Sequence, residues 1–184
     1  MKILFNNLKI FIFFIVLTGV IYPLFITVVS QTVFNDNANG SLITKNGKVV
    51  GSKLLAQDFK DKKYFWPRPS AANYDSAASA ASNLSPDSKT LHETIAKRAT
   101  DNGLDINSND DLLYTSGSGL DPHISPESAE RQLNRIIEAR HLDAGKVDEL
   151  KKLVENHTEH RQLGVLGRTR INVLELNVLL DEKF

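Results

Sequence analysis

Hydrophobic residues dominate one end of the chain. Between Lys9 and Asp36 no residue is charged, and nearly every position from Ile10 to Val33 is apolar. A helix needs about 20 such residues to cross a bilayer, whereas the apolar region of a signal peptide is about 7 to 15 residues long. The sequence around Ala38 is also a poor cleavage site. We therefore expect an uncleaved transmembrane helix at residues 10–34.

The charges that flank this run indicate its orientation. Lys2 and Lys9 precede it, and the first charge beyond it is Asp36. Positive residues concentrate on the cytoplasmic side of membrane helices. We therefore expect a single-pass protein of the cell membrane, with residues 1–9 in the cytoplasm. Residues 35–184, the size of one ordinary domain, are expected on the extracytoplasmic side.

Small residues interrupt the apolar run near its middle. Gly19 and Pro23 are four residues apart and therefore share a helix face, with Thr18 beside them. Such a face allows another helix to approach closely. Alternatively, the same residues mark a local kink that Thr18 relieves. The sequence leaves both interpretations open.

Turn residues and alternating polarity organise the next part of the chain. Ser41–Val50 predicts a β-hairpin that turns at Lys45-Asn46-Gly47, because Asn-Gly is a strong hairpin signal. Ser52–Phe59 can continue the sheet. Tyr64–Pro86 is rich in Ser, Ala, Asn and Pro and predicts a long irregular loop. Its opening, Tyr64-Phe65-Trp66, indicates that aromatic rings hold this loop against the domain or a partner.

Apolar residues at four-residue spacing predict three helices further on. The first covers Ser88–Thr100, and Gly103 would prevent it from continuing. The second begins at Ser125-Pro126, with serine as N-cap and proline at the first helical position, and ends near His141. The third covers Lys146–His157.

Two short apolar runs complete the expected elements. Leu112–Thr115 resembles a short strand. Ile171–Leu180 fits a strand or a helix by its period alone, but Asn172 followed by Glu175 resembles a capping box and favours a helix. The fold class expected is therefore α+β, with one N-terminal transmembrane helix and a single mixed α/β extracytoplasmic domain.

Composition excludes some functions. The chain has 22 basic and 22 acidic residues, so no strong field attracts nucleic acid, and we expect no nucleic-acid partner. It has no cysteine, so it forms neither a disulfide nor a thiolate metal site.

No motif meets the requirements of a catalytic or metal site. Ser116–Gly119 lacks the lysine and hydroxyl that complete a phosphate loop and predicts a tight turn. Asp105–Asn109 lacks the glycine and glutamate of a calcium loop. His157 and His160 are three residues apart but have no third ligand. We therefore predict no catalytic residue, no metal site and no directly bound cofactor.

Six blocks of sequence, read in order, resemble one known family. They are NGSLI (39–43), GSKLLAQDF (51–59), YFWPRPSA (64–71), SNLSP (82–86), TSGSGLDPHISPESAERQ (115–132) and INVLELNVLLD (171–181). Together they resemble the KdpC family, the C subunits of the bacterial Kdp potassium-transporting ATPase. The resemblance runs from the membrane span to the C-terminus.

The resemblance implies a non-catalytic accessory subunit in a membrane complex. Its implied partners are the channel-like KdpA, the P-type ATPase subunit KdpB, the small subunit KdpF and membrane lipid. ATP would act through the ATPase subunit, and potassium would be the ion that the complex transports. The chain has no D-K-T-G phosphorylation site and no T-V-G-Y-G-like filter, so it can neither pump nor select ions by itself.

The family is also credited with raising the ATP affinity of the pump as a catalytic chaperone, a role linked to a glutamine. Gln132 occupies the matching position. A residue outside the membrane cannot touch cytoplasmic ATP, because a bilayer core about 30 Å thick separates them. With this topology, an effect on ATP affinity requires an indirect route, through unequal binding to two pump conformations. The alternative is a solvated glutamine on a helix surface.

We expect the chain to act as a clamp, with its anchor against partner helices and its outer domain on the extracellular mouth of KdpA. Arg68 is expected to face a partner, although it can instead hold the long loop in place. The competing class is a stand-alone membrane-anchored extracytoplasmic enzyme or ligand-binding domain. The interface candidates are Gly19, Pro23, Arg68, Ser116, Gly117, Ser118, Gly119, Leu120 and Asp121.

Overall fold

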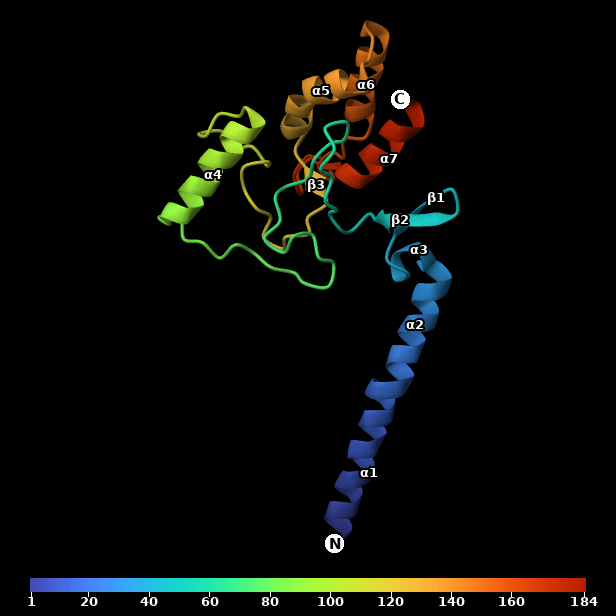
Figure 1. The fold of residues 1–184 in the computed structure, drawn as a ribbon. Coiled ribbons are helices and arrows are strands. Elements are labelled where there is room, and N and C mark those ends of the chain that lie inside the picture. The colour runs from blue at the N-terminus through green and yellow to red at the C-terminus, as the bar shows by residue number, and fades with distance from the viewer. The chain divides into compact units, whose positions relative to one another are not determined.

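The apolar N-terminal segment forms a long helix (Figure 1). The helix has three stretches and is followed by one short helix: α1 (Lys2–Val16), the π-helical η1 (Leu17–Ile21), α2 (Tyr22–Val33) and α3 (Asn35–Ala38). The 32-residue stretch Lys2–Val33 is the one helix long and apolar enough to cross a membrane, and none of its side chains is buried. At 1.5 Å per residue it is about 48 Å long, more than the bilayer core of about 30 Å. The helix thus includes residues before the expected span of 10–34.

The middle of this helix is distorted where the small residues occur. Pro23 has no N–H to donate to the preceding turn, and the backbone from Leu17 to Ile21 forms a π-helix. The Thr18 hydroxyl donates to the Phe14 carbonyl oxygen at 2.7 Å. A Cβ on Gly19 would meet no atom of the chain within 4 Å. The local distortion is present, whereas helix packing on this face stays a prediction.

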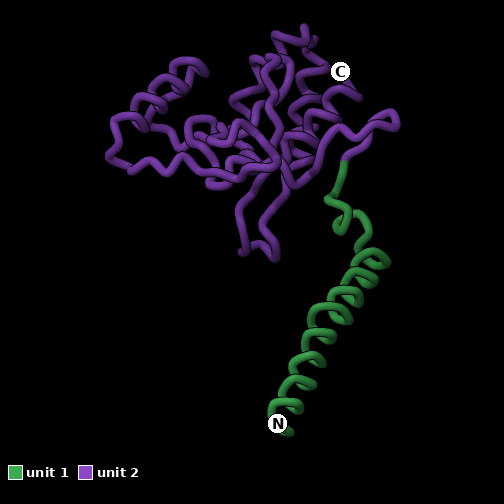
Figure 2. The backbone as a smooth tube through the Cα atoms, turned by 60° about the horizontal axis from the view of Figure 1, so that its bottom comes forward, with its two compact units in different colours: residues 1–42 green, residues 43–184 purple.

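The computed structural model describes residues 1–184 in two compact units, residues 1–42 and 43–184 (Figure 2). Strands and helices in the second part of the chain confirm the mixed α/β class. They are β1 (Leu42–Lys45), β2 (Lys48–Ser52), α4 (Lys89–Asn102), β3 (His123–Ile124), α5 (Pro126–Arg140), α6 (Ala144–Asn156), β4 (Ile171–Asn172) and α7 (Val173–Lys183).

The predicted hairpin is confirmed, but its sheet ends early. β1 and β2 form a two-stranded sheet whose turn residues, Asn46 and Gly47, have φ of 53° and 73°, as a type I′ turn requires. β2 stops at Ser52, so the expected continuation through Ser52–Phe59 is wrong. The Ser52 hydroxyl accepts the Leu54 N–H at 3.1 Å and its carbonyl accepts the Leu55 N–H at 3.3 Å. These bonds turn the chain away from the sheet.

A carboxylate also overrides the strand expected at Leu112–Thr115, where the structure has a turn. Asp110 Oδ1 accepts the Leu112 N–H at 2.9 Å, and the Asp110 carbonyl accepts the Leu113 N–H at 3.0 Å. An Asx turn of this kind competes with strand pairing. The long loop is confirmed, because residues 64–86 contain no helix or strand.

Capping residues set the ends of the helices. Gly103 ends α4 in a left-handed conformation with φ of 63°. The Ser125 hydroxyl accepts the N–H of Ser128 at the start of α5. Asp143 caps α6, which therefore begins two residues before the predicted Lys146. These ends follow the local preferences of glycine, serine and aspartate.

The C-terminal run is a helix, as the capping pattern predicts. Asn172 Oδ1 accepts the Glu175 N–H at 3.1 Å at the start of α7. The two residues before α7 form β4, which pairs antiparallel with β3 through His123 with Asn172 and Ile124 with Ile171. This short pairing was not expected from the sequence.

Helices α5, α6 and α7 enclose the main hydrophobic core. Its buried members are Phe65, Ile124, Ala129, Leu133, Ile136, Leu150, Leu153, Val154, Ile171, Val173, Leu176 and Leu180. Phe65 comes from the irregular loop and is completely buried. A smaller cluster joins Ile95 and Ala99 of α4 to Leu113. The aromatic opening of the loop is thus fixed in the core.

Candidate functional site

Two buried amides hold the main chain of Phe65 and Trp66. Asn177 of α7 accepts the Phe65 N–H at 2.8 Å and donates to the Phe65 carbonyl at 2.9 Å. Gln132 of α5 accepts the Trp66 N–H at 2.7 Å and donates to the Trp66 carbonyl at 3.2 Å. Each amide takes the place of a neighbouring strand for one residue, so the buried backbone groups are paired. We call residues 64–66 with Gln132 and Asn177 the amide clamp.

Gln132 therefore has a structural role that the sequence did not reveal. Gln132 is only 3% exposed, so the alternative of a solvated glutamine on the helix surface is wrong. Besides Trp66, its amide donates to the Ser128 carbonyl at 3.2 Å, and its oxygen accepts from Arg135 at 2.6 Å. All these partners are residues of the same chain. Gln132 fixes the loop to α5.

Two arginines of α5 complete the attachment of the loop. Arg135 donates to the carbonyls of Lys62 and Tyr64 at 2.6 and 2.9 Å, and its guanidinium lies 3.6 Å from the centre of the Trp66 ring. Burial lowers the pKa of Arg135 to about 10, against the opposite effect of the Asp61 charge, so it remains charged at neutral pH. Arg140 donates to the Lys63 carbonyl at 2.9 Å.

Tyr64 and Arg140 share one carboxylate on α7. Asp181 accepts the Tyr64 hydroxyl at 2.8 Å and pairs with Arg140 at 2.6 Å. Burial raises the pKa of Asp181. The hydrogen bonds from Arg140 and Tyr64 and the charges of Arg140 and Lys45 lower this pKa by a larger amount, so the net shift is downward. The carboxylate thus joins the loop, α5 and α7.

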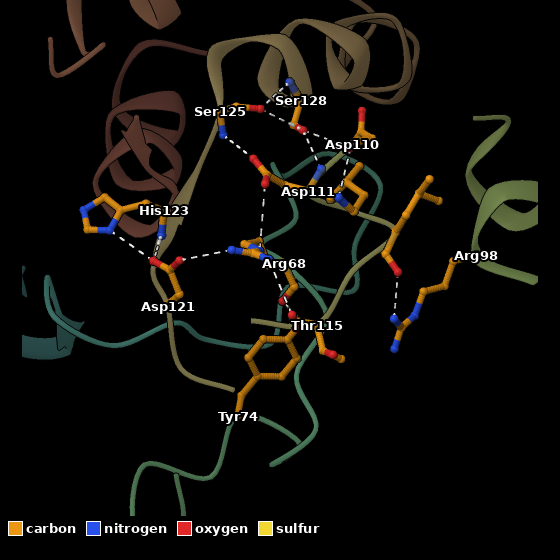
Figure 3. Close-up of polar contacts among 12 residues, drawn as sticks. Arg68, Tyr74, Arg98, Asp110, Asp111, Thr115, Asp121, His123, Ser125 and Ser128 are labelled. Atoms are coloured by element: carbon orange, nitrogen blue, oxygen red, sulfur yellow. Dashed lines mark hydrogen bonds and ion pairs between the residues drawn. The ribbon is translucent and has the colours of Figure 1, made fainter. Parts of the chain in front are cut away.

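Arg68 lies among groups of its own chain (Figure 3). Its guanidinium is 3.6 Å from the Asp121 carboxylate, 3.9 Å from that of Asp111 and 3.4 Å from the Thr115 carbonyl. Asp111 also accepts the Ser125 N–H at 2.6 Å, so the same carboxylate fixes the start of α5. This is the internal role that the sequence left open for Arg68. Contact with a partner stays a prediction.

The electrostatics around Asp121 match this arrangement. Burial raises the pKa of its carboxyl, but hydrogen bonds from the ring and backbone N–H of His123 and the charge of Arg68 lower it by more. Asp121 therefore stays ionised. Its carboxylate also accepts the backbone N–H of His123 at 3.0 Å, which closes a tight turn across Pro122.

The turn from Ser116 to Asp121 is fastened to the irregular loop. Ser116 N–H donates to the Pro69 carbonyl at 3.2 Å, and Ala80 N–H donates to the Ser118 carbonyl at 3.0 Å. Gly119 has φ of 70°, and a Cβ there would lie 2.7 Å from the Ala80 oxygen. Ser116, Gly119 and Leu120 are buried, whereas Gly117 and Ser118 are exposed. Of the six interface candidates in this turn, two are therefore exposed.

Two further features bear on ligand binding. No group of three histidine, cysteine, aspartate or glutamate side chains is arranged to hold a metal ion, and the His157 ring bonds to the Leu153 carbonyl at 2.8 Å. A cavity of about 410 Å³ lies beside Gln132, with Trp66, Arg131 and Arg135 among its lining residues.

The sequence did not single out Asn177, Arg135 or Arg140. One signal pointed to the first: Asn177 is an amide within the apolar run of residues 171–180, and a buried amide requires partners. The two arginines have charged neighbours along α5 and carry no comparable signal.

Known proteins resemble this chain over nearly its whole length. The family model described as "K+-transporting ATPase, c chain" matches residues 4–182. The potassium-transporting ATPase KdpC subunit of Geobacter sulfurreducens is 47% identical and aligns over 92% of both chains. That of Synechocystis sp. is 46% identical, over 91% of this chain and 92% of the relative. That of Dechloromonas aromatica is 45% identical, over 94% and 93%. The chain therefore belongs to the KdpC family, the c chains of K⁺-transporting ATPases.

Proposed function

We propose that the chain is a non-catalytic accessory subunit of an ATP-driven potassium-uptake pump and stabilises the assembly of its channel-like and ATPase subunits. The carrying observation is the family match, which spans both the membrane-length helix and the folded domain. The proposed partners are KdpA, KdpB and KdpF, as the family resemblance implies.

The proposed arrangement is a clamp across the membrane surface. Residues 1–9 lie in the cytoplasm, the apolar helix spans the bilayer, and residues 35–184 lie outside, in accord with Lys2 and Lys9 before the span and Asp36 after it. The Gly19 and Pro23 face of the helix packs against partner helices, where the open space around Gly19 permits close approach. The outer domain covers the extracellular mouth of KdpA.

The effect on ATP, in this proposal, is indirect. ATP binds to KdpB in the cytoplasm, and this subunit raises ATP affinity by binding one pump conformation more tightly than another. Gln132 contributes by holding the Trp66 segment in shape, since its polar contacts are to groups of its own chain.

Detergent pull-down of the tagged full chain tests the proposal. Recovery of the other pump subunits with potassium-stimulated ATPase activity supports it, whereas recovery of a monomer with its own hydrolytic activity favours the stand-alone enzyme. Gly19→Leu should reduce recovery of the partners. The control is Ile21→Phe, which adds bulk on roughly the opposite side of the same helix and should leave recovery unchanged. Equal recovery with both variants would remove the Gly19 face from the interface.

A further inference from the structure

The chain between α6 and β4 folds into an exposed hairpin. Glu159 and Arg170 exchange two backbone hydrogen bonds of 2.8 and 3.0 Å, and Gln162 and Leu166 exchange two of 2.9 Å. The Arg170 side chain also pairs with that of Glu159 at 2.8 Å. We call residues 159–170 the apolar-tipped hairpin.

Its tip exposes three large apolar side chains. Leu163 is 91% exposed, Val165 72% and Leu166 56%. The first two are the most exposed large hydrophobic residues of residues 43–184. Adjacent exposed apolar side chains of this kind mark interaction sites. None of the three belongs to a core cluster of the domain, so these side chains do not contribute to its internal packing.

The charges around this tip have one sign. Arg161, Arg168 and Arg170 flank it, and no carboxylate occurs from residue 160 to residue 170. Arg170 is paired with Glu159, but Arg161 and Arg168 are exposed on either side of the tip. A surface that receives the tip would therefore carry acidic groups at its edge.

The backbone of the tip has one defined shape. Leu163 has φ of 52°, and Gly164 and Gly167 have φ of 76° and 81°. A leucine in the left-handed region is strained, so this conformation is held by the backbone hydrogen bonds of the hairpin. A fluid lipid surface does not require one fixed side-chain geometry, and the hairpin lacks the Trp and Tyr that bilayer interfaces favour. A protein pocket fits these features better than a membrane.

We propose that the apolar-tipped hairpin is a docking element that inserts Leu163, Val165 and Leu166 into an apolar pocket with an acidic rim on another subunit of the pump. This inference rests on the proposed function, because it requires that the chain assemble with other subunits. It adds an interface that is separate from the Gly19 face and from the Ser116–Asp121 turn.

A photo-crosslinking residue at position 163 of the full chain, expressed with the other pump subunits, tests the contact. We expect one crosslinked product with another pump subunit, identified by mass spectrometry. The control is the same residue at position 148, exposed on α6, which should give no such product. Crosslinking only to lipid, or to nothing in an intact pump, would overturn the inference.

A competition experiment measures its strength. Wild type and Leu163→Asn, differently tagged, are expressed together with the pump, and their ratio in the purified complex is measured. We expect the ratio of variant to wild type to be about tenfold or more below one, because docking of the wild type buries Leu163, which is 91% exposed in the free chain. Leu163→Met, which keeps an apolar side chain, should restore most of the incorporation.

Folding is separated from docking by the choice of asparagine. Asparagine tolerates the left-handed conformation better than leucine, so Leu163→Asn should unfold at the same or higher temperature than wild type. Equal incorporation of the variant, with wild type recovered in the pump, overturns the hairpin inference and leaves the proposed function intact. Failure of wild type to recover any pump subunit overturns both.

Discussion

Asn177 pairs with both backbone polar groups of Phe65, 112 residues away in the chain, at 2.8 and 2.9 Å. Gln132 does the same for the next residue, Trp66. The two amides come from different helices, so the segment lies between α5 and α7 as a strand would lie between two neighbours. This arrangement allows a loop without regular structure to supply Phe65 to the core.

The first prediction concerns stability. Asn177→Ala should lower the free energy of unfolding by about 2 kcal/mol or more, because it leaves the buried N–H and carbonyl of Phe65 unpaired. Gln132→Ala should lower it by about 1–2 kcal/mol, because the N–H and carbonyl of Trp66 that it leaves unpaired are partly buried. Urea unfolding of the full chain in detergent, followed by the fluorescence of Trp66, the single tryptophan, measures this loss. The control is Asn134→Ala, which removes an exposed amide from α5, the helix of Gln132. It should change the free energy of unfolding by less than about 0.5 kcal/mol. A Gln132→Ala variant as stable as wild type would contradict the role of the amide clamp.

The second prediction distinguishes two origins of any effect on ATP. Both amides hold the same segment, so Asn177→Ala should change the KM for ATP of the assembled pump in the same direction as Gln132→Ala. If Gln132 instead contacted nucleotide, only its own substitution would change the KM. ATPase assays on pumps purified with each variant, normalised to the amount of incorporated subunit, decide between these outcomes.

Local signals allowed much of the fold to be predicted. The Asn46-Gly47 turn, the Ser125 cap, the end of α4 at Gly103 and the capping asparagine of α7 each depend on contacts within a few residues. Such contacts are encoded in adjacent sequence.

Features that depend on distant residues could not be predicted in the same way. Trp66, whose backbone Gln132 holds, is 66 residues away, and nothing beside Gln132 in the sequence shows that its amide is buried. The turn at Leu112 follows from a single carboxylate, Asp110, whose bonds outweigh the apolar run. The β3–β4 pairing has two residues per strand, too few to produce an alternating pattern.

The third prediction tests the attachment of the Ser116–Asp121 turn to the loop. Gly119→Ala should lower the free energy of unfolding by about 1–3 kcal/mol, because its Cβ would meet the Ala80 backbone oxygen at 2.7 Å and its φ is 70°. Gly117→Ala is the matched control, with open space around the added Cβ and no positive φ. Denaturant midpoints of the two variants should differ clearly, and similar midpoints would mean that the turn is not held against the loop.

The fourth prediction separates the two roles considered for Arg68. If its contacts with Asp111, Asp121 and the Thr115 carbonyl stabilise the domain, Arg68→Ala should lower the free energy of unfolding of the isolated chain by about 1–3 kcal/mol. Arg161→Ala, on the exposed hairpin, should not. A residue that serves only a partner would leave the isolated chain as stable as wild type and lower its incorporation into the pump. Thermal unfolding and pull-down on the same samples give both quantities.

The last prediction follows from the carboxylate that Tyr64 and Arg140 share. Burial raises the pKa of Asp181, but the bonds from Arg140 and Tyr64, with the nearby charges of Arg140 and Lys45, lower it by more. A carboxyl whose pKa is lower in the folded state stabilises the fold fully above its unfolded pKa of about 3.9 and loses this contribution as the pH falls toward its folded pKa. Asp181→Asn should therefore be less stable than wild type at pH 7, and its stability should fall less steeply below about pH 4.

Urea midpoints of wild type and Asp181→Asn, measured from pH 7 down to pH 3, test this expectation. Asp148→Asn, an exposed residue of α6, is the control and should follow the wild-type curve. Because the ion pair with Arg140 requires the ionised carboxylate, the curves of wild type and Asp181→Asn should converge as the pH approaches 3. Parallel curves over this range would show that the ionisation of Asp181 is not linked to folding, and that the contact among the loop, α5 and α7 is maintained by packing instead.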